Sequence, residues 1–167
     1  MRIGLISDTH GFLDEKVFDY FKDCDEIWHA GDFGTIELSD RLAQFKPLKG
    51  VYGNIDDSTI RQVHPKVLNF VCEGKKIIMT HIGGAPGKYV PEVKALLQNQ
   101  QPDIFICGHS HILRVMSDVQ FGKMLYINPG AAGVHGFHKM KTIIRFEINV
   151  GVISNMQAIE LGERARP

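Results

Sequence analysis

Side chains that can bind metal ions follow five short apolar segments of this 167-residue chain. Two clusters place candidates two positions apart, Asp8 with His10 and His109 with His111, so both members project to the same side of an extended backbone. The full candidate set is Asp8, His10, Asp32, Asn54, His81, His109 and His111. Carboxylate and imidazole donors without thiolate favour Mn, Fe, Zn, Co or Ni over Mg or Ca alone. The sequence therefore indicates a transition-metal site.

This set is too large for one ion, and it fits two ions that share a bridging carboxylate. Single members have other interpretations: Asp8 as a helix cap, Asn54 and Asp56 as turn formers, and His81 as a hydrogen-bonded core histidine. Metal binding is favoured because every cluster directly follows a predicted strand. The carboxyl ends of parallel strands meet at one edge of a sheet, where ligands bind.

A glycine stands before a candidate ligand in three of these clusters, at Gly31, Gly53 and Gly108. A residue without a side chain lets the backbone turn sharply and lets a metal ion or phosphate approach it. These glycines therefore agree with a ligand site at the strand ends.

The first two thirds of the chain alternate between strands and helices. Short apolar runs bounded by polar residues predict buried strands at 2–7, 26–29, 48–52, 75–80 and 103–107. Amphipathic spacing predicts helices at 14–22, 35–45 and 90–98. The second helix is expected to begin at a Thr35 cap and to end before Pro47.

The pattern changes after His111. Strands are predicted at 113–119, 124–127, 142–149 and 152–159, with turns at 121–123, 128–130 and 149–151. These segments read as antiparallel hairpins, whereas the earlier ones read as parallel βαβ units. We expect one domain over residues 1–167, of the layered α/β class, with two packed sheets and helices outside.

The composition excludes several functional classes. The chain has 19 Lys+Arg against 19 Asp+Glu, which argues against a dedicated nucleic-acid surface. No apolar run is long enough to span a bilayer. Three cysteines, Cys24, Cys72 and Cys107, lie at no zinc-like spacing and predict buried free thiols in a reducing compartment. No signal-peptide core precedes Asp8, so a cytoplasmic location is expected.

The ordered set of motifs resembles that of the calcineurin-like metallophosphoesterases, above all the small bacterial and archaeal phosphodiesterase branch. The motifs are Asp8-x-His10, Gly31-Asp32, Gly53-Asn54-x-Asp56, His81 and Gly108-His109-x-His111. The resemblance runs from about residue 1 to 129. It implies an α/β (α+β) fold, a four-layer αββα sandwich of two mixed sheets flanked by helices, with two metal ions.

Carried over residue by residue, the resemblance implies two ligand groups that share Asp32 as a bridge. Asp8, His10, Asp32 and His111 would hold one ion, and Asp32, Asn54, His81 and His109 the other. We expect Mn²⁺ first, with Ni²⁺, Co²⁺, Zn²⁺ or Fe as alternatives, and we also assign Asn54 to substrate binding. The implied reaction is hydrolysis of a small phosphoester, a diester before a monoester, by a hydroxide bridging two ions.

The sequence departs from the family at Ile55, where many relatives carry a histidine that protonates the leaving group. Either the proton comes from elsewhere or the enzyme prefers esters with an acidic leaving group. His138 and His135, which follow a glycine-rich stretch, are candidates for this acid. The alternative for both is a solvated, mobile loop. Asp56 is a candidate for orienting a metal ligand through a hydrogen bond without itself binding the ion.

Three further expectations complete the sequence reading. The segment 83–88 lacks the Gly and Ser/Thr positions of a phosphate-binding P-loop, and we interpret it as a loop beside the site, with Lys88 gating substrate. The hairpin-rich C-terminal half presents an edge through which a homodimer could form. The rival functions are a protein-binding scaffold, as in the retromer subunit of the same broad fold, and a closed structural metal site.

Overall fold

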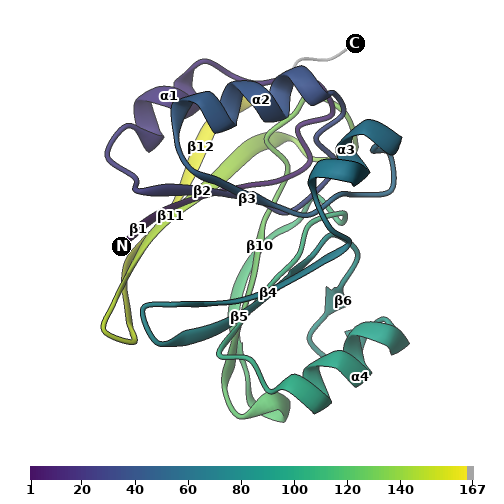
Figure 1. Ribbon diagram of the computed structural model, residues 1–167, viewed down its shortest axis with the longest axis vertical. Helices are drawn as coiled ribbons and strands as arrows, with labels where there is room; N and C mark the ends of the chain where they lie inside the picture. The colour runs from purple at the N-terminus through teal and green to yellow at the C-terminus, as the bar shows by residue number, and fades with distance from the viewer. Residues whose placement is uncertain (165–167) are drawn as a thin grey trace.

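Two five-stranded mixed sheets pack against each other at the centre of the computed structural model, which describes residues 1–164 (Figure 1). In chain order the elements are β1 (Arg2–Ile6), α1 (Lys16–Phe21), β2 (Glu26–His29), α2 (Ile36–Phe45), β3 (Leu48–Gly50), α3 (Ser58–Val63), β4 (Val67–Cys72), β5 (Lys75–Thr80), β6 (Gly84–Ala85), β7 (Lys88–Tyr89), α4 (Pro91–Gln100), β8 (Ile104–Ile106), β9 (Leu113–Asp118), η1 (Val119–Phe121), β10 (Met124–Pro129), β11 (Met140–Asn149) and β12 (Val152–Glu163).

Each sheet has a parallel part and an antiparallel part. The first has the order β12-β11-β1-β2-β3, with β1, β2 and β3 parallel. The second has the order β4-β5-β8-β10-β9, with β5, β8 and β10 parallel. Strands β11, β12 and β9 join antiparallel. The predicted change from parallel units to antiparallel hairpins is confirmed for the C-terminal third.

Helices cover the outer face of each sheet, which completes four layers (Figure 1). Side chains such as Leu5 and Trp28 from the first sheet meet Ile104 and Ile127 from the second in the central core. A second cluster packs α1, α2 and α3 on the first sheet, and a third packs α4 on the other. Each sheet is covered on both faces, which explains why its central strands have continuous apolar sequences. The predicted αββα sandwich is confirmed.

Local signals explain where the second helix begins and ends. The Thr35 hydroxyl accepts a hydrogen bond from the Leu38 backbone N–H at 3.3 Å, so it caps α2 as expected. The helix ends at Phe45, two residues before Pro47. In strand β1, a Cβ atom on Gly4 would lie 2.7 Å from the Phe21 ring, so the glycine lets α1 pack closely against the sheet.

The structure differs from the sequence prediction at several places. Helix α3 and strand β4 were not predicted: α3 has six residues, and β4 is an edge strand with a mixed pattern. The predicted loop at 83–88 instead contains the short β6–β7 hairpin. The turn predicted at 128–130 is wrong in its first two positions, because Asn128 and Pro129 pair with Arg114 and Leu113 at the end of β10. A proline is tolerated there because strand β8 has already ended.

The ligand-bearing strand ends come from both sheets. Strands β1, β2 and β3 lead to Asp8, Asp32 and Asn54, whereas β5 and β8 lead to His81 and His109. The sequence prediction placed all of them at one rim of one open sheet. The site instead lies where the carboxyl ends of two packed sheets meet. In residues 1–164, no helix is long and apolar enough to cross a membrane.

Candidate metal centre

Two groups of potential ligand atoms lie side by side at the junction of the sheets. Asp8, His10 and His111 form one group, and Asp32, His81 and His109 form the other. Within each group the ligand atoms lie within 4.8 Å of one another. All six residues are in the predicted set, so residues up to 103 positions apart in the sequence converge as expected.

Asp32 lies between the two groups. Its Oδ2 atom is 3.2 Å from His81 Nε2 and 3.5 Å from His10 Nε2. His10 belongs to the first group and His81 to the second. A single carboxylate oxygen is therefore in reach of nitrogen donors of both groups, which is the geometry that a bridging ligand needs.

Each buried carboxylate has one oxygen fixed by the protein and one directed into the site. Asp8 Oδ2 accepts from the Ser7 hydroxyl at 2.6 Å and from the His109 backbone N–H at 3.1 Å. Asp32 Oδ1 accepts from the Ile55 backbone N–H at 3.1 Å. These donors orient the side chains, so that Asp8 Oδ1 and Asp32 Oδ2 face the imidazoles.

His81 presents Nε2 to the centre because its other nitrogen is held behind it. Nδ1 lies 2.8 Å from the Ala30 carbonyl oxygen, which can only accept, so Nδ1 carries a proton. The Nε2 lone pair then faces Asp32 Oδ2 at 3.2 Å and Asp8 Oδ1 at 3.9 Å. Two carboxylates opposite a lone pair repel it unless a proton or a cation lies between them.

Burial and charge act in opposite directions on the pKa values of the site. Burial raises the pKa of Asp32, but the hydrogen bond and charge of His81 outweigh it, and the pKa lies below its ordinary value. Burial lowers the pKa of His81, but Asp32 and Asp8 raise it above 6.5 overall. For His10, burial prevails over both carboxylates and the pKa is lowered. The centre therefore favours the ionised form of Asp32.

The polar atoms left without partners fit a pair of cations. Among residues 1–164, Asp8 Oδ1 and His10 Nε2 are buried and have no hydrogen-bond partner. A buried polar atom without a partner costs about 1–3 kcal/mol, so native proteins seldom contain one unless it binds something else. Both atoms belong to the predicted ligand set. The donor set therefore fits divalent transition metals, which bind carboxylate and imidazole together.

The backbone of the site is strained at most of the ligands. Five non-glycine ligand candidates have a positive φ angle in the left-handed region: Asp8 (53°), His10 (48°), Asp32 (57°), His109 (67°) and His111 (57°). Such conformations cost on the order of 1 kcal/mol each and occur where function requires them. The chain turns sharply at each strand end, which brings the ligands of both sheets together.

The three predicted glycines are required because other ligands occupy the space beside them. A Cβ atom on Gly53 would overlap Asp32 Oδ1, and one on Gly108 would lie 2.7 Å from Asp8 Oδ2. On Gly31, where φ is 97°, a Cβ would lie 2.6 Å from His81 Nδ1. The chain turns at these glycines as expected, and the space that a side chain would need is occupied by ligand side chains.

Asn54 and Asp56 have separate positions. Asn54 Oδ1 lies 3.1 Å from His81 Nε2, on the side of the second group. The Asp56 carboxylate accepts from the backbone N–H groups of Gly34 at 2.8 Å and Gly53 at 2.7 Å. Asp56 thus joins the loop after Asp32 to the loop before Asn54 and touches no ligand side chain in these bonds.

The loop after Gly133 adds two histidines to the first group. The His135 ring lies 5.3 Å from that of His10, and the His138 ring 5.2 Å from that of His111, between centroids. His138 Nε2 is 2.9 Å from the Gly133 carbonyl oxygen, so it donates. Burial lowers the pKa of His138, and its Nδ1 is buried without a partner in the described chain.

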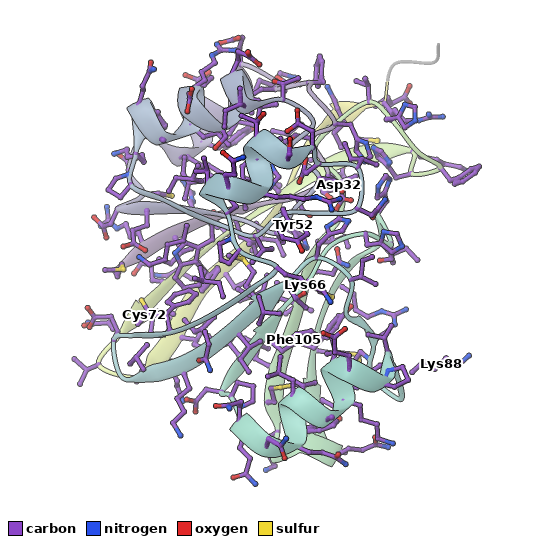
Figure 2. All side chains as sticks on the ribbon, turned by 45° about the vertical axis from the view of Figure 1, so that its right-hand side comes forward. Asp32, Tyr52, Lys66, Cys72, Lys88 and Phe105 are labelled. Carbon is purple, nitrogen blue, oxygen red and sulfur yellow. The ribbon has the colours of Figure 1, made fainter. Side chains whose placement is uncertain are left out.

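The Lys88 side chain points away from the metal centre. It belongs to the β6–β7 hairpin, and Figure 2 shows its side chain extending into solvent, far from Asp32. The side chain lines a small pocket of about 260 Å³ together with His109 and Arg114. A gating role for Lys88 is therefore still a prediction.

Sequence reasoning missed the polar residues behind the ligands. Ser7, Thr9 and His29 are fully buried, and they hold Asp8 and the loop of Asp32. One signal was available, since polar residues at the end of an apolar strand need buried partners. Which partners they find depends on contacts between β1 and β2, which the sequence does not encode locally.

The chain is similar to a phosphoesterase family and to two of its curated members. Residues 1–151 match the model of the calcineurin-like phosphoesterase superfamily domain. A probable metallophosphoesterase of Methanothermobacter thermautotrophicus is 30% identical over 141 residues, which cover 80% of this chain and 78% of that protein. Another, from Methanocaldococcus jannaschii, is 30% identical over 139 residues, covering 80% of this chain and 69% of the relative.

Solved structures share the fold. An archaeal phosphodiesterase superposes with a TM-score of 0.71 at 20% identity, covering 96% of this chain and 100% of its own. Vps29 from Entamoeba histolytica, in a complex with Zn²⁺, gives a TM-score of 0.70 at 20% identity, covering 96% and 99%. At these identities the likeness establishes the architecture.

Proposed function

Because the chain belongs to the calcineurin-like phosphoesterase superfamily, we propose that it is a metal-dependent phosphodiesterase whose centre holds two divalent ions. The observation that carries the proposal is the pair of adjacent ligand groups with Asp32 Oδ2 between them, 3.2 and 3.5 Å from nitrogens of each. The archaeal phosphodiesterase with the same fold supports the choice of a diester.

The ligand assignment follows the geometry and the family motif. Asp8, His10, Asp32 and His111 would hold one ion; Asp32, Asn54, His81 and His109 would hold the other. When bound, such a pair supplies a water nucleophile at neutral pH and neutralises phosphoryl oxygens. We keep Mn²⁺ as the first choice, and the Zn²⁺ in a Vps29 structure supports testing Zn²⁺ too.

The chain's own residues fix the geometry of this reaction. Ser7 and the His109 N–H hold Asp8, the Ile55 N–H holds Asp32, and the Ala30 carbonyl keeps the His81 proton on Nδ1. Phosphoryl transfer depends mainly on positioning and charge stabilisation, so this support is most of what the protein must contribute.

The test is substitution of the bridging carboxylate. Asp32→Asn keeps the shape but removes the charge, and we expect loss of hydrolysis of bis(4-nitrophenyl) phosphate together with loss of bound metal. Elemental analysis of the purified Mn, Ni, Co and Zn forms gives ions per chain, and Asp19→Asn, an exposed acid on α1, is the control. Normal activity in Asp32→Asn would overturn the proposal.

The scaffold alternative rests on the Vps29 neighbours. It predicts that metal-reconstituted protein hydrolyses neither monoesters nor diesters. The complete ligand set favours catalysis, since a chain without that task needs no strained ligand residues with buried atoms left unpartnered, as Asp8 Oδ1 and His10 Nε2 are among residues 1–164. One tightly bound Zn²⁺ without phosphoesterase activity would instead support a structural metal site.

A further inference from the structure

A groove of about 490 Å³ adjoins the metal centre on the side of the second ligand group. Two of its lining residues, Asn54 and His81, are candidate ligands. From there it continues past the ends of β4 and β5 towards the first turns of α4. Its apolar walls are Tyr52, Val67, Ile82, Val90, Val93 and Leu96. We call this the Tyr52–Leu96 groove, and Figure 2 labels Tyr52 and Lys66, two of its lining residues.

The volume and lining of the groove suit an organic group rather than a second phosphate. Pockets that enclose small organic ligands have volumes of about 300–1,000 Å³ and mostly apolar walls. Ile82 is 41% exposed, so part of this apolar wall faces solvent in the structure. Exposed apolar surface beside a reactive centre is a typical binding surface.

Charge is confined to the rim of the groove. Lys66 Nζ lies 3.0 Å from the Glu92 carboxylate, which neutralises it. Arg61 donates to the backbone carbonyls of Asp56 and Asn54 and lies 4.8 Å over the Tyr52 ring, with no carboxylate in ion-pair distance within residues 1–164. One uncompensated positive charge therefore lines the groove beside Asn54, a candidate ligand, where it favours an anionic ester.

Two other cavities fit less well. The larger one, about 720 Å³, lies between the end of α4 and η1, and none of the candidate ligands lines it. The cationic side chains there are Lys75, Lys94 and Lys123, and Lys75 is paired with the Asp103 carboxylate at 3.2 Å. The pocket of about 260 Å³ beside His109 touches the centre but has roughly half the volume of the groove. Of these three cavities in the described part of the chain, the Tyr52–Leu96 groove is the one that combines contact with the ligands, size and apolar walls.

We propose that this groove binds an aromatic ring carried by the phosphoester, so that the substrates are phosphoesters of ring-bearing groups. The phosphate would lie at the metal centre, and the ring would extend along Tyr52 towards Leu96. This inference rests on the proposed function, because it assumes that the centre binds the phosphate. A ring also fits Ile55, since an aromatic alcohol is an acidic leaving group that needs no donated proton.

The experiment compares two non-hydrolysable ligands that differ only by the ring, phenylphosphonate and methylphosphonate. Calorimetry on the metal-loaded protein is expected to give at least about tenfold tighter binding of phenylphosphonate, the scale of burying several CH groups. Methyl NMR signals of Val90, Val93 and Leu96 are expected to shift with phenylphosphonate and not with methylphosphonate.

Matched variants on one helix test the location. Leu96→Trp places a large ring in the groove. We expect the affinity for phenylphosphonate to fall until it is within about twofold of that for methylphosphonate, while the affinity for methylphosphonate is unchanged. Ala95→Trp, one position along and exposed, is expected to keep the preference. Should Leu96→Trp fail to fold, Leu96→Ala is expected to weaken phenylphosphonate binding about fourfold, because it removes apolar contact.

The outcomes separate this inference from the proposed function. No ring preference in the wild type, or a preference that survives Leu96→Trp, overturns the groove assignment. A wild type that binds phenylphosphonate selectively yet hydrolyses no phosphoester leaves the groove assignment standing and removes the proposed function. A wild type that hydrolyses phosphoesters without a ring preference leaves the proposed function standing and overturns the groove assignment.

Discussion

Thr9 Oγ1 and His29 Nε2 lie 3.0 Å apart in a fully buried layer directly behind the metal centre. The Thr9 hydroxyl also lies 3.0 Å from the Phe33 carbonyl oxygen, to which it donates its single proton. It must therefore accept from His29 Nε2–H, while His29 Nδ1 accepts from the Gly31 N–H at 3.1 Å. Burial lowers the pKa of His29 far below 6.5, in agreement with a neutral ring.

This pair predicts the effect of Thr9→Val, which keeps the side chain's size and removes its hydroxyl. The His29 N–H and the Phe33 carbonyl would lose a buried partner, at a cost of about 1–3 kcal/mol. We expect a lower free energy of unfolding in urea and weaker metal binding, because the loops that carry Asp8 and Asp32 lose a hydrogen bond between them. Thr59→Val, at an exposed position of α3, is the control. Unchanged metal affinity would mean that the layer does not position the ligands.

A second prediction concerns the source of the leaving-group proton. The His138 Nδ1 atom is buried without a partner in the described chain and lies beside His111. Because Nε2 keeps its proton on the Gly133 carbonyl, Nδ1 can donate only from the doubly protonated ring, which the lowered pKa confines to acidic pH. If His138 is the acid, His138→Ala slows hydrolysis of alkyl esters at acidic pH more than that of nitrophenyl esters, by about 10²-fold, the lower end of general acid catalysis. The measurement is kcat for both ester types in one metal form. Equal losses for both would assign His138 a structural role only.

The pH dependence of stability is predicted at Asp14. Burial raises its pKa, but hydrogen bonds from Lys141 and from the Lys16 backbone outweigh burial and hold it below 3.8. The Asp14 and Lys141 side chains, 2.6 Å apart, are 14% and 9% exposed. A lowered pKa means that the stabilisation is present above pH 3.8 and is lost as pH falls through the folded value.

Asp14→Asn is therefore expected to reduce the free energy of unfolding at pH 7 by about 2 kcal/mol, the scale of a charged hydrogen bond. Below the folded pKa, variant and wild type should become equally stable. Denaturant unfolding at a series of pH values measures the difference, with the exposed Asp23→Asn as control. A difference that persists at the lowest pH would contradict the linkage.

The cysteines are predicted to be unreactive in the folded protein. Cys24, Cys72 and Cys107 are free and buried, as the sequence predicted. Burial raises the pKa of Cys24 to about 11 and that of Cys107 to about 12. Because the thiolate is the reactive form, we expect a thiol reagent near neutral pH to react only as fast as the chain opens. In denaturant all three should react at once; fast reaction of the folded protein would contradict the burial.

The sequence predicted those parts of the fold that have a local signal. Helix α2 follows from Thr35, its apolar spacing and Pro47, and strand β2 lies at the predicted residues 26–29. Helix α3 was missed because one turn and a half of mixed residues has no periodicity, and its stability comes from the Asp57 cap and the burial of Ile60.

The candidate site was predictable in its residues but not in its arrangement. Each ligand carries its own motif, so the set could be read from spacing and from the family resemblance. The division between two sheets, the Thr9–His29 layer and the Tyr52–Leu96 groove depend on residues distant in sequence. Those contacts form only when both sheets pack, and no local pattern encodes them.

The left-handed backbone at Asp8, His10, Asp32, His109 and His111 has a consequence for how the family can change. A descendant released from phosphoester chemistry would become more robust by exchanging these residues for glycine or asparagine, which adopt that conformation readily. Relatives selected for thermal stability would then differ from relatives selected for catalytic turnover, and the first differences would lie at these five positions at the carboxyl ends of the strands.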